Sequence, residues 1–111
     1  MTENEFMKAA IKMAIEAYDD GEVPVGAVIV RDNIIVAKGR NRREKEKNAL
    51  LHAEIGAINN ACKTLGGWRL WNCEIYVTLE PCPMCAGAII NARLKSVFYG
   101  ADDEKSRSDI W

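Results

Sequence analysis

The chain has 111 residues, of which 49% are hydrophobic and 28% are charged. These fractions match an ordinary globular domain, which excludes a disordered, collagenous or coiled-coil chain, and the length predicts a single domain over residues 1–111. The formal net charge of −1 excludes a protein that holds nucleic acid through basic charge spread over the whole chain. Residues 38–47 carry six of the fifteen basic residues against two acidic ones, a composition typical of a local basic patch and equally of a solvated loop.

The first residues carry acidic side chains and no apolar signal-peptide core, and no stretch approaches the roughly 18 continuous apolar residues of a membrane-spanning helix. We therefore expect a cytoplasmic protein without membrane contact. In that compartment cysteines are expected to stay reduced. The chain has four of them: Cys62, Cys73, Cys82 and Cys85.

The chain is expected to begin with a helix. Residues 2–5 read Thr-Glu-Asn-Glu, the pattern of a capping box, and residues 19–21 read Asp-Asp-Gly, which ends the helix. Between them, apolar residues recur at helical spacing in two adjacent stripes: Phe6, Ala10, Met13 and Ala17, and beside them Met7, Ile11, Ala14 and Tyr18.

An antiparallel hairpin is predicted next, with strands over about 25–31 and 34–39 and a tight turn at Asp32-Asn33. The apolar run 27–30 predicts that the first strand is covered on both faces. A polar loop over 40–48 follows.

The second half of the chain predicts a helix over 52–65, a strand over 74–78, a helix that opens at Pro81-Cys82-Pro83, and a strand over 97–99. The order α-β-β-α-β-α-β predicts a sheet with helices on its faces. Trp68 and Trp71 follow a helix, and we expect them to pack a loop rather than to stack on bases.

His52, Cys82 and Cys85 carry the clearest chemical signal. Two cysteines three positions apart at a helix start lie on one face and can share a metal ion, and thiolates are favoured at that end of a helix. His52 begins another helix, so the two helix starts can converge on one ion. One nitrogen and two sulfur ligands favour zinc.

Three protein ligands leave the fourth tetrahedral position open, as in catalytic zinc sites. A closed structural site would need Cys73 or Cys62 as the fourth ligand. Cys62 lies on the apolar stripe of its helix and is expected in the core, whereas Cys73 fits either role. Glu54 favours the catalytic interpretation, because a carboxylate beside a zinc-bound water can move a proton to a leaving amine. Its alternative is a first-turn acid that only complements the helix dipole.

The motif His52-Ala53-Glu54, followed by Pro-Cys-Pro-Met-Cys over 81–85, resembles the signature H-x-E…P-C-x-x-C of the zinc-dependent cytidine/deoxycytidylate deaminase superfamily. The stretches 22–28, 39–42 and 76–88 are most similar to tRNA-specific adenosine deaminases of the TadA type, which make inosine at the anticodon wobble position. The resemblance runs from about residue 4 to residue 105. It implies a three-layer α-β-α cytidine-deaminase-like fold of class α/β with a mixed central sheet.

The resemblance also implies roles for individual residues. His52, Cys82 and Cys85 would bind Zn²⁺, and Glu54 would be the catalytic proton shuttle while zinc hydroxide attacks the amine-bearing ring carbon. The substrate-binding positions that it implies are Asn41, Val25, Ala53 and Pro81. The expected partners are a tRNA anticodon stem-loop and a second copy of the chain in a homodimer.

Two departures from the family pattern are visible. Residues 48–51 read Asn-Ala-Leu-Leu where the family has an Asp-Pro-Thr-like run, and residues 102–111 replace the segment that leads into a last strand and helix. We therefore expect that strand and helix to be missing and one sheet edge to be exposed. Two alternatives stay open: a deaminase of free guanine, cytosine or cytidine, and an inactive or structural zinc-binding subunit.

Overall fold

The predicted order of elements is confirmed by the computed structural model, which describes residues 2–100. Its elements are α1 (Glu3–Asp19), β1 (Gly26–Arg31), β2 (Ile34–Arg40), α2 (Ala53–Leu65), β3 (Cys73–Val77), α3 (Pro83–Asn91) and β4 (Ser96–Tyr99). Residues 101–111, which include the predicted departure from the family pattern and Trp111, lie outside the described residues. None of the helices within 2–100 is long and apolar enough to cross a membrane.

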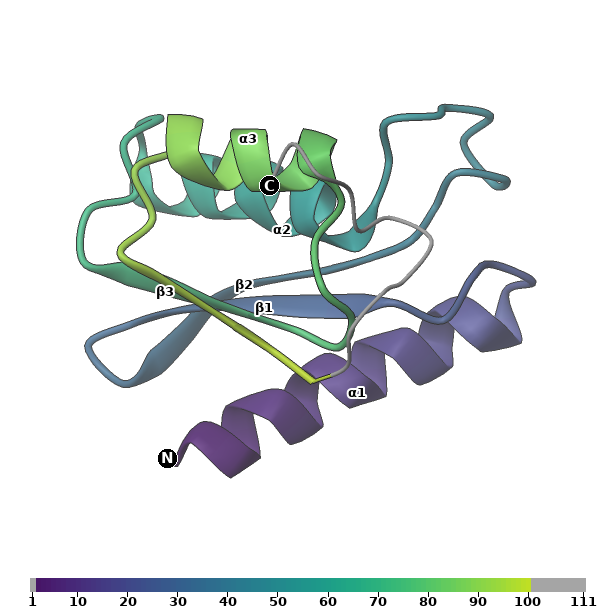
Figure 1. The fold of residues 1–111 in the computed structure, drawn as a ribbon, viewed down its shortest axis with the longest axis horizontal. Helices are drawn as coiled ribbons and strands as arrows, with labels where there is room; N and C mark the ends of the chain where they lie inside the picture. The colour runs from purple at the N-terminus through teal and green to yellow at the C-terminus, as the bar shows by residue number, and fades with distance from the viewer. Residues whose placement is uncertain (1, 101–111) are drawn as a thin grey trace.

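The four strands form one mixed sheet in the order β2-β1-β3-β4. Strand β1 is antiparallel to both of its neighbours, and β3 and β4 are parallel. Helix α1 covers one face of the sheet, while α2 and α3 lie over the other (Figure 1). This arrangement confirms the three-layer α-β-α fold, and β4 forms the expected open edge within the described part of the sheet.

Alternation along the strands divides the core into two clusters. Ala27 and Ile29 of β1 belong to the cluster under α2, while Val28 and Val30 belong to the cluster that includes Phe6 of α1. Both faces of β1 are therefore covered, which explains its uninterrupted apolar run. On the α1 side, the ring of Tyr76 stacks on Phe98 and lies close to Phe6.

Local signals explain where the elements begin and turn. The Thr2 hydroxyl accepts a hydrogen bond of 3.3 Å from the backbone N–H of Glu5 and so caps α1, as the capping-box pattern predicts. Asp32 and Asn33 both have positive φ, at 51° and 64°, as a tight hairpin turn requires. Gly66 has φ 76° and ends α2 in the left-handed conformation.

The structure shows which apolar residues of α1 are buried, and it corrects the expectation for two tryptophans. In the second apolar stripe of α1, Ile11 and Tyr18 are 46% and 68% exposed, because the sheet contacts only the face that carries Phe6, Ala10, Ala14 and Ala17. Trp68 and Trp71 are 52% and 56% exposed rather than packed under a loop. The Arg69 guanidinium lies 4.1 Å from the centre of the Trp68 ring, which accounts for part of the remaining cover.

Candidate metal centre and substrate pocket

One end of the sheet carries the candidate site. Because β1 is antiparallel to β2 and β3, the start of β1 lies beside the ends of the other two strands. Helix α2 also begins at this end. A cavity of about 140 Å³ opens there, and the residues that line it are Val23, Val25, Asn41, Arg43, His52, Glu54, Leu79, Glu80 and Cys82.

His52, Cys82 and Cys85 come together in the structure although thirty residues separate the first two. Their potential ligand atoms all lie within 4.8 Å of one another. His52 is the N-cap of α2 and Cys82 is the N-cap of α3, and neither side chain makes a capping hydrogen bond. Both side chains are therefore available to a ligand held between the two helix starts.

The separation of these atoms fits a zinc ion. The Cys82 Sγ lies 3.7 Å from the His52 Nδ1. Zinc bonds of about 2.3 Å to sulfur and 2.0–2.1 Å to nitrogen, at tetrahedral angles, place two such ligands about 3.6 Å apart. The donor set of one imidazole and two thiols is also the soft set that zinc prefers over hard cations. The residues present thus fit this metal in chemistry and in spacing.

The pKa values around the cluster also describe a site for a cation. Burial raises the pKa of the Cys85 thiol far above its ordinary value, and the nearby charges of Glu54 and Cys82 raise it further. Burial lowers the pKa of His52, with a smaller contribution from the positive charge of Arg43. A neutral imidazole is the form that binds metal, and a bound cation would offset the repulsion among the anionic groups.

Cys73 and Cys62 are not part of this cluster. Among the described residues, the one group of metal-ligand side chains with this spacing is His52, Cys82 and Cys85. Cys73 is fully buried in the core at the start of β3, and Cys62 packs against the same core from α2. The alternative of a fourth cysteine ligand therefore has no support in the geometry of residues 2–100.

Glu54 lies in the first turn of α2 and is only 3% exposed. Burial raises the pKa of its carboxyl group, although a bond to its own backbone N–H and one to the Cys85 side chain act in the opposite direction. Glu54 lines the same cavity as His52 and Cys82. A buried carboxyl group with a raised pKa holds a proton more readily than an exposed one, and its position beside a metal-ligand cluster suits proton transfer.

Asn41 is also buried, at 5% exposure, and lines the cavity at the end of β2. Its Oδ1 accepts a hydrogen bond of 3.0 Å from the backbone N–H of Ala53, and its backbone N–H donates to the Val25 carbonyl over 3.2 Å. The first bond fixes the side chain against the start of α2, and the second fixes the backbone beside Val25. The amide NH₂ keeps its donor capacity for a bound group.

The sequence matches a family model described as "MafB19-like deaminase" over residues 1–110. The chain belongs to the MafB19-like deaminase family.

Several relatives of this deaminase chain carry a more specific name. It is 52% identical over 106 residues to a tRNA-specific adenosine deaminase of Bacillus subtilis, a match that covers 95% of this chain and 66% of that protein. It is 54% identical over 101 residues to a tRNA-specific adenosine deaminase of Rickettsia bellii, covering 89% of this chain and 70% of that one. The chain thus spans about two thirds of the length of these relatives.

Solved structures of deaminases share the fold. One comes from a study of A-to-I editing by tRNA:A34 deaminases at the wobble position of transfer RNA; it has a TM-score of 0.91 and 45% identity, covering 93% of this chain and 79% of that one. A guanine deaminase of Bacillus subtilis has a TM-score of 0.89 and 46% identity, covering 92% of this chain and 66% of that one.

Two predicted substrate contacts of this deaminase chain lie outside the cavity lining. Val25 and Asn41 line the cavity, but Ala53 is fully buried behind it and contributes its backbone N–H to Asn41. Pro81 is buried and lines a different cavity, between α3 and β4. The structure therefore places only two of the four predicted positions at the cavity wall.

Other cavity residues of the deaminase chain were missed by sequence reasoning. Three of them, Val23, Leu79 and Glu80, lie in the stretches that resemble the family. The resemblance covers these residues, but nothing in the sequence distinguishes them from their neighbours. Arg43 lies in the basic segment 38–47, whose composition is typical both of a local basic patch and of a solvated loop. Glu22 is the third missed feature: it is buried but does not line the cavity, and it supports the loop that carries Arg43.

Proposed function

We propose that this protein is a zinc-dependent hydrolytic deaminase that converts adenosine to inosine at the wobble position of a tRNA anticodon. The observation that carries the proposal is the convergence of His52, Cys82 and Cys85 beside the buried Glu54, at a cavity at one end of the sheet. Relatives with about 50% sequence identity are named tRNA-specific adenosine deaminases, which supports the choice of substrate.

His52, Cys82 and Cys85 would hold the zinc ion. When bound, the ion would supply a Lewis acid that makes a water molecule a stronger nucleophile. The helix starts that carry His52 and Cys82 favour anionic ligands, because their free N–H groups and dipoles stabilise negative charge. His52 and Cys82 line the cavity and Cys85 is buried beside them, so these residues would hold the ion at the cavity wall.

Glu54 would carry the proton. Its carboxylate takes a proton from the attacking water and delivers it to the amine that leaves as ammonia. The burial of Glu54 supports this role, since it raises the pKa toward the range in which both protonation states are accessible.

The cavity wall would select and orient the base. The Asn41 amide is held by Ala53 and offers a donor to a polar edge of the base, and Val25 offers an apolar surface. The volume of about 140 Å³ is small beside the 300–1,000 Å³ of typical ligand pockets, which suits a single base with the rest of the substrate outside. Ala53 and Pro81 stay as predicted contacts from the family resemblance.

The proposal includes the setting of the enzyme. The partner would be the anticodon stem-loop of a tRNA, because relatives carry the name of tRNA-specific adenosine deaminases. We also propose a homodimer and a cytoplasmic location, both from the family resemblance. A second candidate function is deamination of free guanine, which is favoured by the similarity to a guanine deaminase at 46% identity.

An ammonia-release assay separates these candidates. The zinc-loaded protein is offered an anticodon stem-loop RNA with adenosine at the wobble position and, separately, guanine, cytosine and cytidine. We expect ammonia and inosine from the RNA. Ammonia from guanine alone would favour the second candidate, and no ammonia from any substrate, despite one bound zinc per chain, would favour a structural zinc-binding subunit.

The variant Glu54→Gln serves as the catalytic control. It keeps the shape of the side chain but cannot carry the proton, so kcat should fall by a factor of about 100 or more. The zinc content should stay at one per chain, because Glu54 is not a ligand. Turnover at the wild-type rate would show that Glu54 is not the proton carrier.

A further inference from the structure

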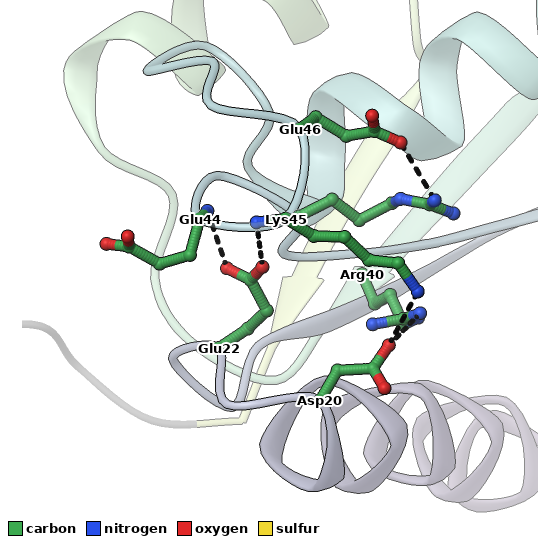
Figure 2. Close-up of polar contacts among 7 residues, drawn as sticks. Asp20, Glu22, Arg40, Glu44, Lys45 and Glu46 are labelled. Atoms are coloured by element: carbon green, nitrogen blue, oxygen red, sulfur yellow. Dashed lines mark hydrogen bonds and ion pairs between the residues drawn. The ribbon is translucent and has the colours of Figure 1, made fainter.

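Glu22 is a buried carboxylate that the proposed reaction does not use. The buried polar or charged residues within 2–100 are Glu22, Asn41 and Glu54, and the last two line the cavity. Glu22 instead accepts two hydrogen bonds from the backbone of the 42–48 loop. The N–H of Glu44 donates to Oε1 over 3.1 Å and the N–H of Lys45 donates to Oε2 over 2.8 Å (Figure 2).

Glu22 is itself fixed to the end of α1. Its backbone N–H donates to the carbonyl of Ala17 over 2.9 Å, and the N–H of Gly21 donates to Tyr18 over 3.0 Å. Its carboxylate therefore presents two acceptors at a defined place on the body of the protein. The hydrogen bonds are charge-assisted, which makes them stronger than bonds between neutral groups.

The 42–48 loop is held by its own backbone hydrogen bonds together with the two bonds to Glu22. Within the loop, the N–H of Glu46 donates to the carbonyl of Arg42 over 3.0 Å and the N–H of Lys47 donates to that of Glu44 over 3.3 Å. At its start, the N–H of Arg42 donates to Leu51 over 3.0 Å, and across the loop the N–H of Asn48 donates to Arg43 over 3.0 Å. Glu44 and Lys45 come directly after Arg43. The two bonds to Glu22 thus restrain the backbone immediately beyond the one loop residue that lines the cavity.

Arg43 has the chemistry of a phosphate contact. Its side chain is exposed, lies at the cavity rim and carries a positive charge that is felt by His52. A guanidinium group binds phosphate oxygens through paired N–H donors, and such contacts position a nucleic acid without reading its sequence. A base in the cavity would leave its flanking phosphates near the rim.

We propose that Glu22 is a positioning residue that fixes the 42–48 loop through the amides of Glu44 and Lys45, and so holds Arg43 against a phosphate that flanks the target base. This inference rests on the proposed function, because it requires a nucleic-acid substrate. Glu22 acts through the loop and does not touch the reacting atoms.

The first test measures RNA binding without turnover. In the Glu54→Gln background, the dissociation constant of the anticodon stem-loop is measured for added Glu22→Gln, Arg43→Ala and both together. Glu22→Gln has one acceptor oxygen in place of two, so we expect RNA binding to weaken about threefold to fivefold. Arg43→Ala loses an exposed charged contact, and we expect RNA binding to weaken by a similar factor. The double variant should bind no more weakly than Arg43→Ala alone. Additive losses would overturn the action of Glu22 through Arg43.

Asp20→Asn is the matched control. Asp20 lies two residues from Glu22 and loses the same charge in this variant, but it pairs with the side chains of Arg40 and Lys45 rather than with the loop backbone (Figure 2). We expect its RNA affinity to equal that of the parent. A loss as large as that of Glu22→Gln would show that the acidic charges at the end of α1, rather than the two backbone hydrogen bonds to Glu22, set the RNA affinity, and would overturn the proposal.

Two further measurements separate this proposal from the proposed function. Amide hydrogen exchange of Glu44 and Lys45 should accelerate in Glu22→Gln and not in Asp20→Asn, whether or not the protein is active; unchanged exchange would overturn the anchoring role. In the active protein, Glu22→Gln should raise KM for the RNA and leave kcat unchanged. A protein that deaminates no substrate would contradict the proposed function, while the amide exchange and RNA affinity would still decide the role of Glu22.

Discussion

At the scale of single residues, two buried carboxylates of similar exposure have opposite electrostatic environments. Burial dominates at Glu54 and raises its pKa. At Glu22, burial also acts to raise the pKa, but the backbone N–H groups of Lys45 and Glu44 and the charge of Arg40 outweigh it, so the pKa lies below its ordinary value of 4.5. The first environment suits proton transfer, and the second suits a permanently charged anchor.

The lowered pKa of Glu22 predicts how stability depends on pH. Above pH 4.5 the group is ionised in both states and its hydrogen bonds stabilise the folded state; as the pH falls below 4.5 and through the folded-state pKa, that stabilisation is lost. Urea denaturation should therefore show a higher free energy of unfolding for the wild type than for Glu22→Gln at pH 7. The difference should shrink below pH 4.5. A difference that stays constant down to pH 3 would contradict the assignment.

At the scale of elements, glycines set the distance between the sheet and its helices. A Cβ atom on Gly26 would overlap the backbone of α1, and one on Gly39 would overlap the backbone of α2 at Ala53 and Ala57. The absence of a side chain at Gly39 thus lets α2 lie directly on β2. Because His52 is the N-cap of α2 and Glu54 lies in its first turn, this close approach also affects the position of both side chains at the cavity.

The variant Gly39→Ala tests this contact. The added methyl group meets backbone rather than a flexible side chain, so α2 must move, and we expect a loss of about 1–3 kcal/mol in the free energy of unfolding. Gly87→Ala in α3 is the control, because its Cβ would meet nothing within 4 Å; it should be neutral or more stable by about 0.5–1 kcal/mol. Equal effects of the two substitutions in thermal or urea denaturation would contradict the role of close packing.

At the scale of the whole molecule, the candidate metal centre joins the two helix starts on the same side of the sheet. The body of α2 and strand β3 separate the starts of α2 and α3 in the sequence, yet the Cys82 Sγ lies 3.7 Å from the His52 Nδ1. A bound ion would connect these segments in the folded protein only. Metal binding should therefore add to the stability of the entire fold.

Zinc should raise the melting temperature. An ion at 100 times its dissociation constant contributes about 2.7 kcal/mol, and each kcal/mol shifts the melting temperature of a domain of this size by about 4–8 °C, so a rise of about 10 °C or more is expected. Cys62→Ser should keep this response, whereas Cys82→Ser should lose it, because Cys82 belongs to the cluster and Cys62 does not. Thermal scans with and without a chelator measure both. The same zinc response in the two variants would contradict the assigned ligands.

Most of the fold could be predicted from the sequence because its signals are local. The capping box at Thr2, the Asp32-Asn33 turn and the apolar run of β1 each depend on neighbouring residues, and the element order is confirmed. The His-x-Glu and Cys-x-x-Cys motifs are local as well. Their spacing identified the cluster that the structure brings together.

What could not be predicted depends on contacts between distant segments. Glu22 directly follows the Asp-Asp-Gly end of the first helix and carries no local signal of burial; its two hydrogen bonds come from Glu44 and Lys45, more than twenty residues later. The exposure of the Trp68 side chain likewise depends on whether distant elements pack against it. Periodicity describes one element at a time and carries no information on such tertiary contacts.

The attachment of the 42–48 loop through main-chain amides has a consequence for how such a scaffold diversifies. Any residue other than proline at positions 44 and 45 keeps the backbone N–H group that donates a hydrogen bond to Glu22. The side chains at these positions can therefore change while the two hydrogen bonds to Glu22 remain. Replacement of the loop sequence, with the bonds to Glu22 kept, would then alter the rim of the cavity and leave the candidate metal centre unchanged. The loop that would contact the substrate is therefore separate from the residues that would carry out the reaction.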